Sequence, residues 1–422
     1  QEVCQSTQLL LDHLLELLGQ GDMKLMYKSN ILKYFSFVAL SILFSTYYYL
    51  YFFSFDQGIS SASGSIRLSI FFLGVLLFVL TFFKFQNRVI ISPVAFALLL
   101  FIILSMIIFL LKVMFFDGLS GNNILFSAFG ILFVLFEYRL ANHEERTQQF
   151  MEMSLWILMI QIIIDICLRY NGIKLWDDGS YVGGLGNPSS FALFNIVNVA
   201  YLLFLRKITI ITMIGIPLIF FAILKTESLF GIIALIIVVV YYFYQIINVR
   251  HVYTKLSFVC FILITVFSLL SVYFALDVFF SNSHLFYKID SLLNALFGGH
   301  KILSNSASIS IRSDNYSNAW NYLNANVFDM LLYGNRFIYT SVDSQLLTYL
   351  YSYGILTSFL FLTTILMMLS DKMYGFSSQY KNFIKIILVI FCLMFLSNRI
   401  IDYYPILVVY LVLISSMLRG NN

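Results

Sequence analysis

Long apolar runs separated by short polar segments repeat along almost the whole chain. A helix needs about 20 apolar residues to cross the hydrocarbon core of a membrane. Within a bilayer, unbroken apolar runs of that length satisfy their backbone hydrogen bonds by forming helices. We therefore predict an all-α polytopic membrane protein with about twelve spanning helices, near residues 31–53, 66–83, 89–111, 122–137, 150–168, 189–205, 208–224, 228–247, 256–276, 344–369, 382–396 and 400–418.

One long polar stretch interrupts this pattern and sets the domain organisation. The first nine predicted spans lie within residues 23–276, a large loop covers residues 277–342, and the last three spans lie within residues 343–422. Residues 1–22 carry acids, whereas a signal peptide begins with basic residues. Because the methionines and lysines that follow would make a natural start, we interpret residues 1–22 as a non-native or upstream extension.

Composition supports this fold class, and the basic residues orient it. The chain is 60% hydrophobic and 11% charged, whereas a soluble domain carries about a quarter charged residues. If the N-terminus lies inside, cytoplasmic segments hold 15 of the 25 Lys and Arg residues, and short outward loops hold six. Because basic residues favour the cytoplasmic side, both termini are predicted to be cytoplasmic and the large loop to lie on the other side.

Six basic residues in short outward loops oppose this bias. They are Arg67, Lys112, Arg169, Lys174, Lys225 and Arg399. Each could reach water from a helix end along its flexible stem. Taken together they favour an anionic ligand at the outer membrane surface, and the sequence leaves both interpretations open.

Two of these outward loops combine charge with other polar groups. The segment 169–190 contains a glycine turn followed by Asn187-Pro188, a pair typical of a helix start. Such a start is either a capped structural turn or a helix N-terminus whose free N–H groups bind phosphate. In the second loop Lys225 and Glu227 lie two residues apart, as an ion pair or as substrate contacts.

Helical spacing predicts an amphipathic helix in the large loop. Its stripe consists of Tyr316, Ala319, Trp320 and Leu323, with Arg312 one turn earlier on the same face. Such a helix would lie on the membrane surface. The apolar stripe by itself favours packing, but an Arg on that stripe is harder to explain as a solvated charge.

Further candidates follow that helix. Arg336 lies after Tyr333-Gly334-Asn335, and Asp343 is placed to cap the helix of the tenth span. The helix dipole would also keep the Asp343 carboxylate ionised, as a hydrogen-bond acceptor or weak base. Arg399 and Asp402 form one more outward pair, most simply an ion pair.

Other classes of function lack their signatures. The chain has no P-loop, HExxH or GxSxG motif. The outward histidines lack ligand spacing and no outward loop offers a DxD motif, so we predict no metal and no cofactor, and no nucleic-acid partner. Asp165 is the main acid inside a predicted span, whereas an ion-coupled transporter usually needs more intramembrane ionisable groups.

Three segments, in this order, resemble the O-antigen polymerase (Wzy) family, within the superfamily that it shares with the O-antigen ligases. GLGNPSSFA at 184–192 is similar to the family's Gly-Asn-Pro-Asn segment, which opens a membrane helix. The run from Arg312 through Trp320 to Gly334 is similar to the Arg–Trp–Gly pattern of its large periplasmic loop. Residues 342–360, with Gly354-Ile355, are similar to the segment after that loop. The likeness covers most of residues 168–360.

The resemblance implies a metal-independent glycosyltransferase in the bacterial inner membrane, with its large loop in the periplasm. It would move the growing glycan from undecaprenyl diphosphate onto the incoming lipid-linked repeat unit, beside membrane lipids and a Wzz-type chain-length regulator. Its diphosphate leaving group needs charge neutralisation, for which Arg312 is our first choice. The helpers would be Arg169, Lys225, Arg336 and Arg399, with Asn187 at the phosphate-binding helix start. Asp343 or Glu227 would activate the acceptor hydroxyl, and Tyr316 and Trp320 would stack on sugars.

Two departures from the superfamily keep alternatives open. Ligases and many relatives have a Ser-Arg pair after the seventh span, whereas here Ser228 precedes Leu229. Ligases also have His-Asn after the large loop, where this chain has Asp343-Ser344. The missing His favours a polymerase over an O-antigen ligase, which would transfer polymer to lipid A-core. A lipid-linked oligosaccharide flippase is the alternative from another class, and it would line a path through the spans with charges.

Overall fold

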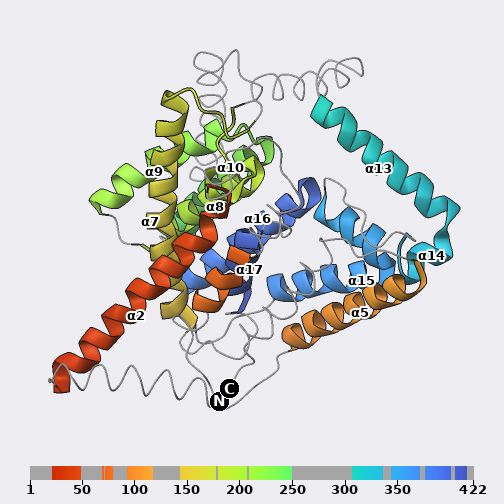
Figure 1. The fold of residues 1–422 in the computed structure, drawn as a ribbon, viewed down its shortest axis with the longest axis horizontal. Helices are drawn as coiled ribbons and strands as arrows, with labels where there is room; N and C mark the ends of the chain where they lie inside the picture. Colours follow the sequence, from red (N-terminus) through yellow and green to blue (C-terminus); the bar gives the residue numbers. More distant parts are fainter. Residues whose placement is uncertain are drawn as a thin grey trace.

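The structure is a computed structural model and describes residues 21–48, 69–70, 72–78, 93–116, 143–176, 179–206, 209–249, 307–335, 344–370, 376–400 and 404–415. Of these residues, 87% are helical and none lies in a strand, so the predicted all-α class is confirmed for this part. The elements with defined bounds (Figure 1) are α2 (Gly21–Phe44), α5 (Pro93–Phe116), α7 (His143–Tyr170), η1 (Gly183–Leu185), α8 (Pro188–Phe204), α9 (Ile210–Lys225), α10 (Leu229–Val249), α13 (Ala307–Ala325), α14 (Val327–Leu332), α15 (Gln345–Ser370), α16 (Ser378–Ser397) and α17 (Tyr404–Ser415).

The helices follow the apolar runs of the sequence. Nine of the twelve predicted spans overlap a helix with defined bounds. The span at 66–83 is described in part and is helical there, and those at 122–137 and 256–276 lie outside the described residues. In the part of the chain that the structure describes, four helices, α7, α10, α15 and α16, are long and apolar enough to cross a membrane. The described part therefore has the character of a multi-pass helical membrane protein.

Two groups of helices meet at α16. Helix α8 lies at the centre of the first group and packs against α7, α9, α10 and α16. In the second group α15 packs against α5, α14 and α16, and α5 (orange) and α15 (blue) lie side by side in Figure 1. Aromatic rings fill these contacts, as between Phe204 of α8 and Tyr241 of α10 (5.8 Å between centroids) or Phe101 of α5 and Phe361 of α15 (5.1 Å). The many phenylalanines of the sequence thus serve helix packing.

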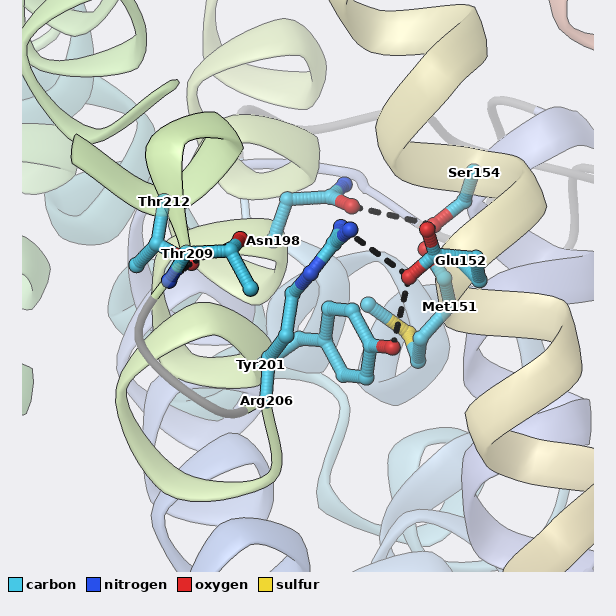
Figure 2. A network of polar contacts seen from close by, with 8 residues as sticks. All are labelled: Met151, Glu152, Ser154, Asn198, Tyr201, Arg206, Thr209 and Thr212. Atoms are coloured by element: carbon cyan, nitrogen blue, oxygen red, sulfur yellow. Dashed lines mark hydrogen bonds and ion pairs between the residues drawn. The ribbon is translucent and has the colours of Figure 1, made fainter. Parts of the chain in front are cut away.

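A partly buried polar network holds α7 to α8 and to the segment after it (Figure 2). Glu152 Oε2 accepts a hydrogen bond from the Tyr201 hydroxyl (2.9 Å) and pairs with Arg206 Nη1 (3.0 Å). Two residues further along α7, the Ser154 hydroxyl donates to Asn198 Oδ1 (3.0 Å). The Glu152 carboxylate neutralises Arg206, so this basic residue serves a contact within the protein.

Contacts between neighbouring helices define two ends of the bundle. The Glu152 end holds the start of α7, the end of α8, the end of α10 and the start of α16, joined by the pairs Tyr380–Thr147 (2.9 Å) and Tyr241–Asn382 (3.3 Å). The opposite end holds Asp165, the start of α8 and the turn between α9 and α10. We call these the Glu152 end and the Asp165 end.

Helix α15 is interrupted at Gly354, whose φ of 81° and ψ of 176° are not helical. The interruption leaves carbonyl groups of α15 without their usual helical N–H donors. Other segments provide donors for these carbonyls. Asn335 N donates to Tyr351 O (2.7 Å), and Lys112 Nζ donates to Ser352 O (2.6 Å). The sequence placed Lys112 outward as a possible ligand contact, but its side chain is 1% exposed. Lys112 therefore donates a hydrogen bond to a carbonyl at the end of the first half of α15.

Replacing Gly334 with alanine is expected to lower the free energy of unfolding by roughly 3 kcal/mol. Gly334 has a φ of +83°, and a Cβ there would collide with Tyr351 O. Gly172→Ala is the matched control, because Gly172 has a φ of +76° with nothing within 4 Å of the added Cβ. Backbone strain alone should cost that variant about 1 kcal/mol. Equal shifts of the two thermal unfolding midpoints in detergent would show that the close contact at Gly334 does not matter.

Candidate functional site

Asp165, near the end of α7, organises the Asp165 end of the bundle. Its side chain is 4% exposed, and both carboxylate oxygens are used. The Tyr48 hydroxyl donates to Oδ1 (2.5 Å) and Gly183 N donates to Oδ2 (2.9 Å). Buried carboxylates persist only with such partners. Asp165 therefore joins α7 to the segment after α2 and to the loop before α8.

That loop, residues 179–187, is called here the glycine loop. Gly183 and Gly186 have φ values of +55° and +74°, which favour glycine. A Cβ on Gly183 would also meet the Phe191 ring, and one on Gly184 would meet Phe44 O. The glycines thus allow the loop to lie directly against its neighbouring helices, with residues 183–186 buried.

The predicted helix start at Asn187-Pro188 is confirmed. Asn187 Oδ1 accepts a hydrogen bond from Ser190 N (3.1 Å), and Pro188 occupies the first helical turn of α8. Because one N–H group of the first turn is capped and the preceding glycines are buried, the structural interpretation accounts for this segment. The phosphate-binding interpretation of Asn187 gains no support from this geometry.

The glycine loop also contacts two basic residues. Arg169, in the last turn of α7, is exposed, and its guanidinium lies so close to Gly179 that a Cβ there would collide with it. Tyr181 N donates to Lys225 O (2.9 Å), which joins the loop to the turn between α9 and α10. Burial raises the pKa of the Tyr181 hydroxyl; the Asp165 charge raises this pKa further, while the Arg169 charge lowers it. Both charges therefore lie within electrostatic reach of Tyr181.

Lys225 and Glu227 are two further charged residues at the Asp165 end that interact with Arg169 or with each other. Lys225 Nζ lies 5.7 Å from the centroid of the Phe221 ring, a cation–π distance. The charge of Lys225 interacts favourably with Glu227 and unfavourably with Arg169. Glu227 has a φ of 52°, which a residue other than glycine adopts at a cost. We call Asp165, Arg169, Tyr181, Lys225 and Glu227 the Lys225 cluster.

The structure thus brings together three of the residues predicted from the sequence, Arg169, Lys225 and Glu227. Asn187 lies in the adjoining loop. Arg399 follows the end of α16 at the same end of the bundle, and Tyr316 of α13 donates from its hydroxyl to Leu396 O there (2.6 Å). Trp320, one turn further along α13, is 65% exposed.

Three other predicted residues have no described side chain. Arg312 lies in α13, so this segment is helical as predicted, and Arg336 and Asp343 lie outside the described residues. The predicted cap position is corrected by one residue. Helix α15 begins at Gln345, so Ser344 precedes it, and its hydroxyl accepts from Leu347 N (3.4 Å).

The sequence did not assign two members of the cluster, Asp165 and Tyr181. An acid within an apolar span is a functional signal by itself, so Asp165 could have been chosen. Tyr181 carried no such signal, because only its contact with the Lys225 turn places it in the cluster.

The Lys225 cluster is suited to binding an anionic group. Arg169 offers an exposed planar fork of donors, and Lys225 offers a half-buried ammonium. Glu227 provides a carboxylate two residues from that ammonium, and the described residues include no group of three or more His, Cys, Asp or Glu side chains that could hold a metal ion.

Comparisons with known proteins add no assignment. No protein-family model matches the chain, and no curated protein matches it either. What the described residues show is an all-helical bundle with the character of a multi-pass membrane protein and a mixed-charge cluster at one end.

Proposed function

We propose that the chain is an O-antigen polymerase of the Wzy type, a membrane glycosyltransferase that uses a lipid-diphosphate-linked donor. The observation that carries this proposal is the grouping of Arg169, Lys225 and Glu227 at one end of the apolar helices. A lipid diphosphate keeps its chain in the membrane and its charge at the surface. Two cations at the end of apolar helices would suit such a headgroup.

The proposed reaction transfers the growing glycan. A hydroxyl oxygen of the incoming lipid-linked repeat unit forms a bond to the anomeric carbon of the donor glycan, and the bond from that carbon to undecaprenyl diphosphate breaks. The hydroxyl proton passes to a carboxylate, and the diphosphate leaves with the bonding electrons. Cations that contact this leaving group stabilise its developing charge, and no proton donor is required.

Within this mechanism the residues take distinct roles. Arg169 and Lys225 would contact the diphosphate, with Arg312, Arg336 and Arg399 as further proposed contacts. Glu227 or Asp343 would accept the hydroxyl proton. The exposed rings of Tyr316 (45%) and Trp320 (65%) would stack on sugars of the glycan.

Deletion of the gene in its host, followed by electrophoresis of the surface polysaccharide, tests the reaction. A polymerase predicts that the ladder collapses to core plus a single repeat unit. Complete loss of polymer from the core with lipid-linked polymer still accumulating would identify a ligase. An unchanged ladder would contradict the whole proposal and favour a transport function instead.

The buried charges support a flippase less well than a polymerase. Asp165 is bound by Tyr48 and Gly183, and Lys112 by a carbonyl of α15. These two charges therefore serve contacts within the protein, whereas a flippase would present charges to a path through the spans.

Replacing Glu227 with glycine distinguishes the role of its carboxylate from the effect of its backbone conformation. Glycine adopts a φ of 52° without strain, so Glu227→Gly is expected to raise the free energy of unfolding by up to about 1 kcal/mol. If Glu227 is the base, the same variant should slow polymerisation by about 100-fold or more. Thermal unfolding in detergent and transfer between purified lipid-linked repeat units measure the two effects.

The control is Glu227→Asn, because asparagine tolerates this backbone conformation but carries no charge. It should fold like the wild-type protein and lose activity like the glycine variant. Full activity in both variants would remove Glu227 from the mechanism and leave Asp343 as the candidate base.

A further inference from the structure

A groove separate from the Lys225 cluster lies between α10 and α16 near the Glu152 end. Its volume is about 410 Å³, within the range of small-molecule sites. Aliphatic side chains such as Ile237 and Val389 form most of its lining, and Tyr241, Tyr244 and Lys385 are its polar-tipped members. Both helices are long and apolar enough to cross a membrane.

Hydrogen bonds and ring contacts fix the tyrosine side of the groove. The Tyr241 hydroxyl donates to Asn382 Oδ1 (3.3 Å), and Asn382 Nδ2 donates to Gln245 Oε1 (3.1 Å). The Tyr241 and Tyr244 rings stack with their centroids 6.5 Å apart. Tyrosines with an apolar body and a bonded polar tip are typical of the level where a membrane meets water.

Lys385 supplies a positive charge beside this apolar lining. Lys381 lies one turn earlier on α16, and both side chains are half-buried. In the described part of the chain neither lysine forms an ion pair, whereas Arg206 at the same end is paired with Glu152 (3.0 Å). The groove therefore combines an apolar channel with two cations that no residue in the described part of the chain neutralises.

We propose that this groove binds an anionic glycerophospholipid, with an acyl chain along the aliphatic lining and the phosphate at Lys385 and Lys381. An apolar groove open to the outside of the bundle suits an acyl chain, because Val389 and Tyr244 remain 39% and 52% exposed. A basic pocket between membrane helices suits an anionic headgroup. The site holds whether or not the chain is a polymerase.

The test uses the full chain purified in detergent, with phosphatidylglycerol and phosphatidylcholine of identical acyl chains as probes. Native mass spectrometry should show tighter binding of the first phosphatidylglycerol than of phosphatidylcholine. Lys385→Gln should weaken that first binding by about five-fold, since each lysine near an anionic headgroup contributes on that scale. Lys174→Gln, which removes an exposed lysine at the Asp165 end, should leave it unchanged.

Photo-crosslinking of the wild-type protein locates the site independently of any variant. Phosphatidylglycerol with a photoactivatable acyl chain should label α10 and α16, and excess unlabelled phosphatidylglycerol should suppress the labelling. Equal labelling of the exposed apolar faces of α2 and α5, equal binding of the two lipids, or competition by inorganic phosphate alone would each overturn the proposal.

Discussion

Replacing Asp165 with alanine is expected to lower the free energy of unfolding by about 3 kcal/mol and to loosen the glycine loop. The substitution leaves Gly183 N without its acceptor (2.9 Å) in a buried site, and it leaves the Tyr48 hydroxyl with only Gln161 O (3.2 Å) in place of the carboxylate (2.5 Å). An unsatisfied buried donor costs about 1–3 kcal/mol. Thermal unfolding in detergent measures the global effect, and hydrogen–deuterium exchange of residues 179–187 measures the local one.

Two further variants show how much each hydrogen bond of Asp165 contributes to this loss of stability. Tyr48→Phe removes the donor to Asp165 Oδ1 and should cost about 2 kcal/mol, because a buried carboxylate oxygen loses this hydrogen bond while Gly183 N still binds the other oxygen. Asp165→Asn keeps one carbonyl oxygen and should fall between the other two variants. If Asp165→Ala destabilises no more than Tyr48→Phe and the exchange of the glycine loop stays as in the wild type, Asp165 does not hold this loop.

Replacing Lys225 with methionine is expected to slow polymer formation by about 100-fold, the scale seen when one donor to a developing charge is removed. Methionine keeps an apolar stem beside the Phe221 ring but removes the charge that lies 5.7 Å from its centroid. Arg169→Gln should have an effect of similar size. Transfer between purified lipid-linked repeat units gives the rate, and the surface polysaccharide ladder gives the product length.

Lys174→Met is the matched control, since Lys174 is an exposed lysine in the segment between α7 and the glycine loop. It should leave both rate and ladder unchanged. Arg169→Lys keeps the charge but loses the planar fork, so an intermediate rate would indicate bidentate binding of the diphosphate. Normal ladders from both Lys225→Met and Arg169→Gln would exclude the Lys225 cluster as the diphosphate site.

Hydropathy located the helices with small errors at their ends. The predicted spans 189–205, 208–224 and 228–247 correspond to α8, α9 and α10, which begin at Pro188, Ile210 and Leu229. Helix α7 begins at His143, earlier than the span predicted at 150–168, because Glu144 and Glu145 extend it beyond its apolar part. Hydropathy reports the apolar stretch of a helix, whereas hydrogen bonding decides where the helix starts.

The candidate site was predicted only in part. Arg169, Lys225 and Glu227 were chosen because charges in short outward loops are unusual, and the structure places them together. The same argument failed for Lys112, whose ammonium is buried against Ser352 O (2.6 Å). Charge in a loop predicts proximity to the membrane surface, but it does not show whether the side chain points toward solvent or into the protein.

The sequence by itself determined the helical membrane class, most helix positions and the capped start of α8 at Asn187, because apolar run length and helix capping are local properties. Only the tertiary structure decided the partners of the buried charges. Asp165 and Tyr48 are 117 residues apart, and Lys112 and Ser352 are 240 apart. The interruption of α15 at Gly354 likewise depends on Lys112 and Asn335, which satisfy the carbonyls that it exposes. A buried polar group must find a partner, but which partner it finds is fixed by how distant helices pack.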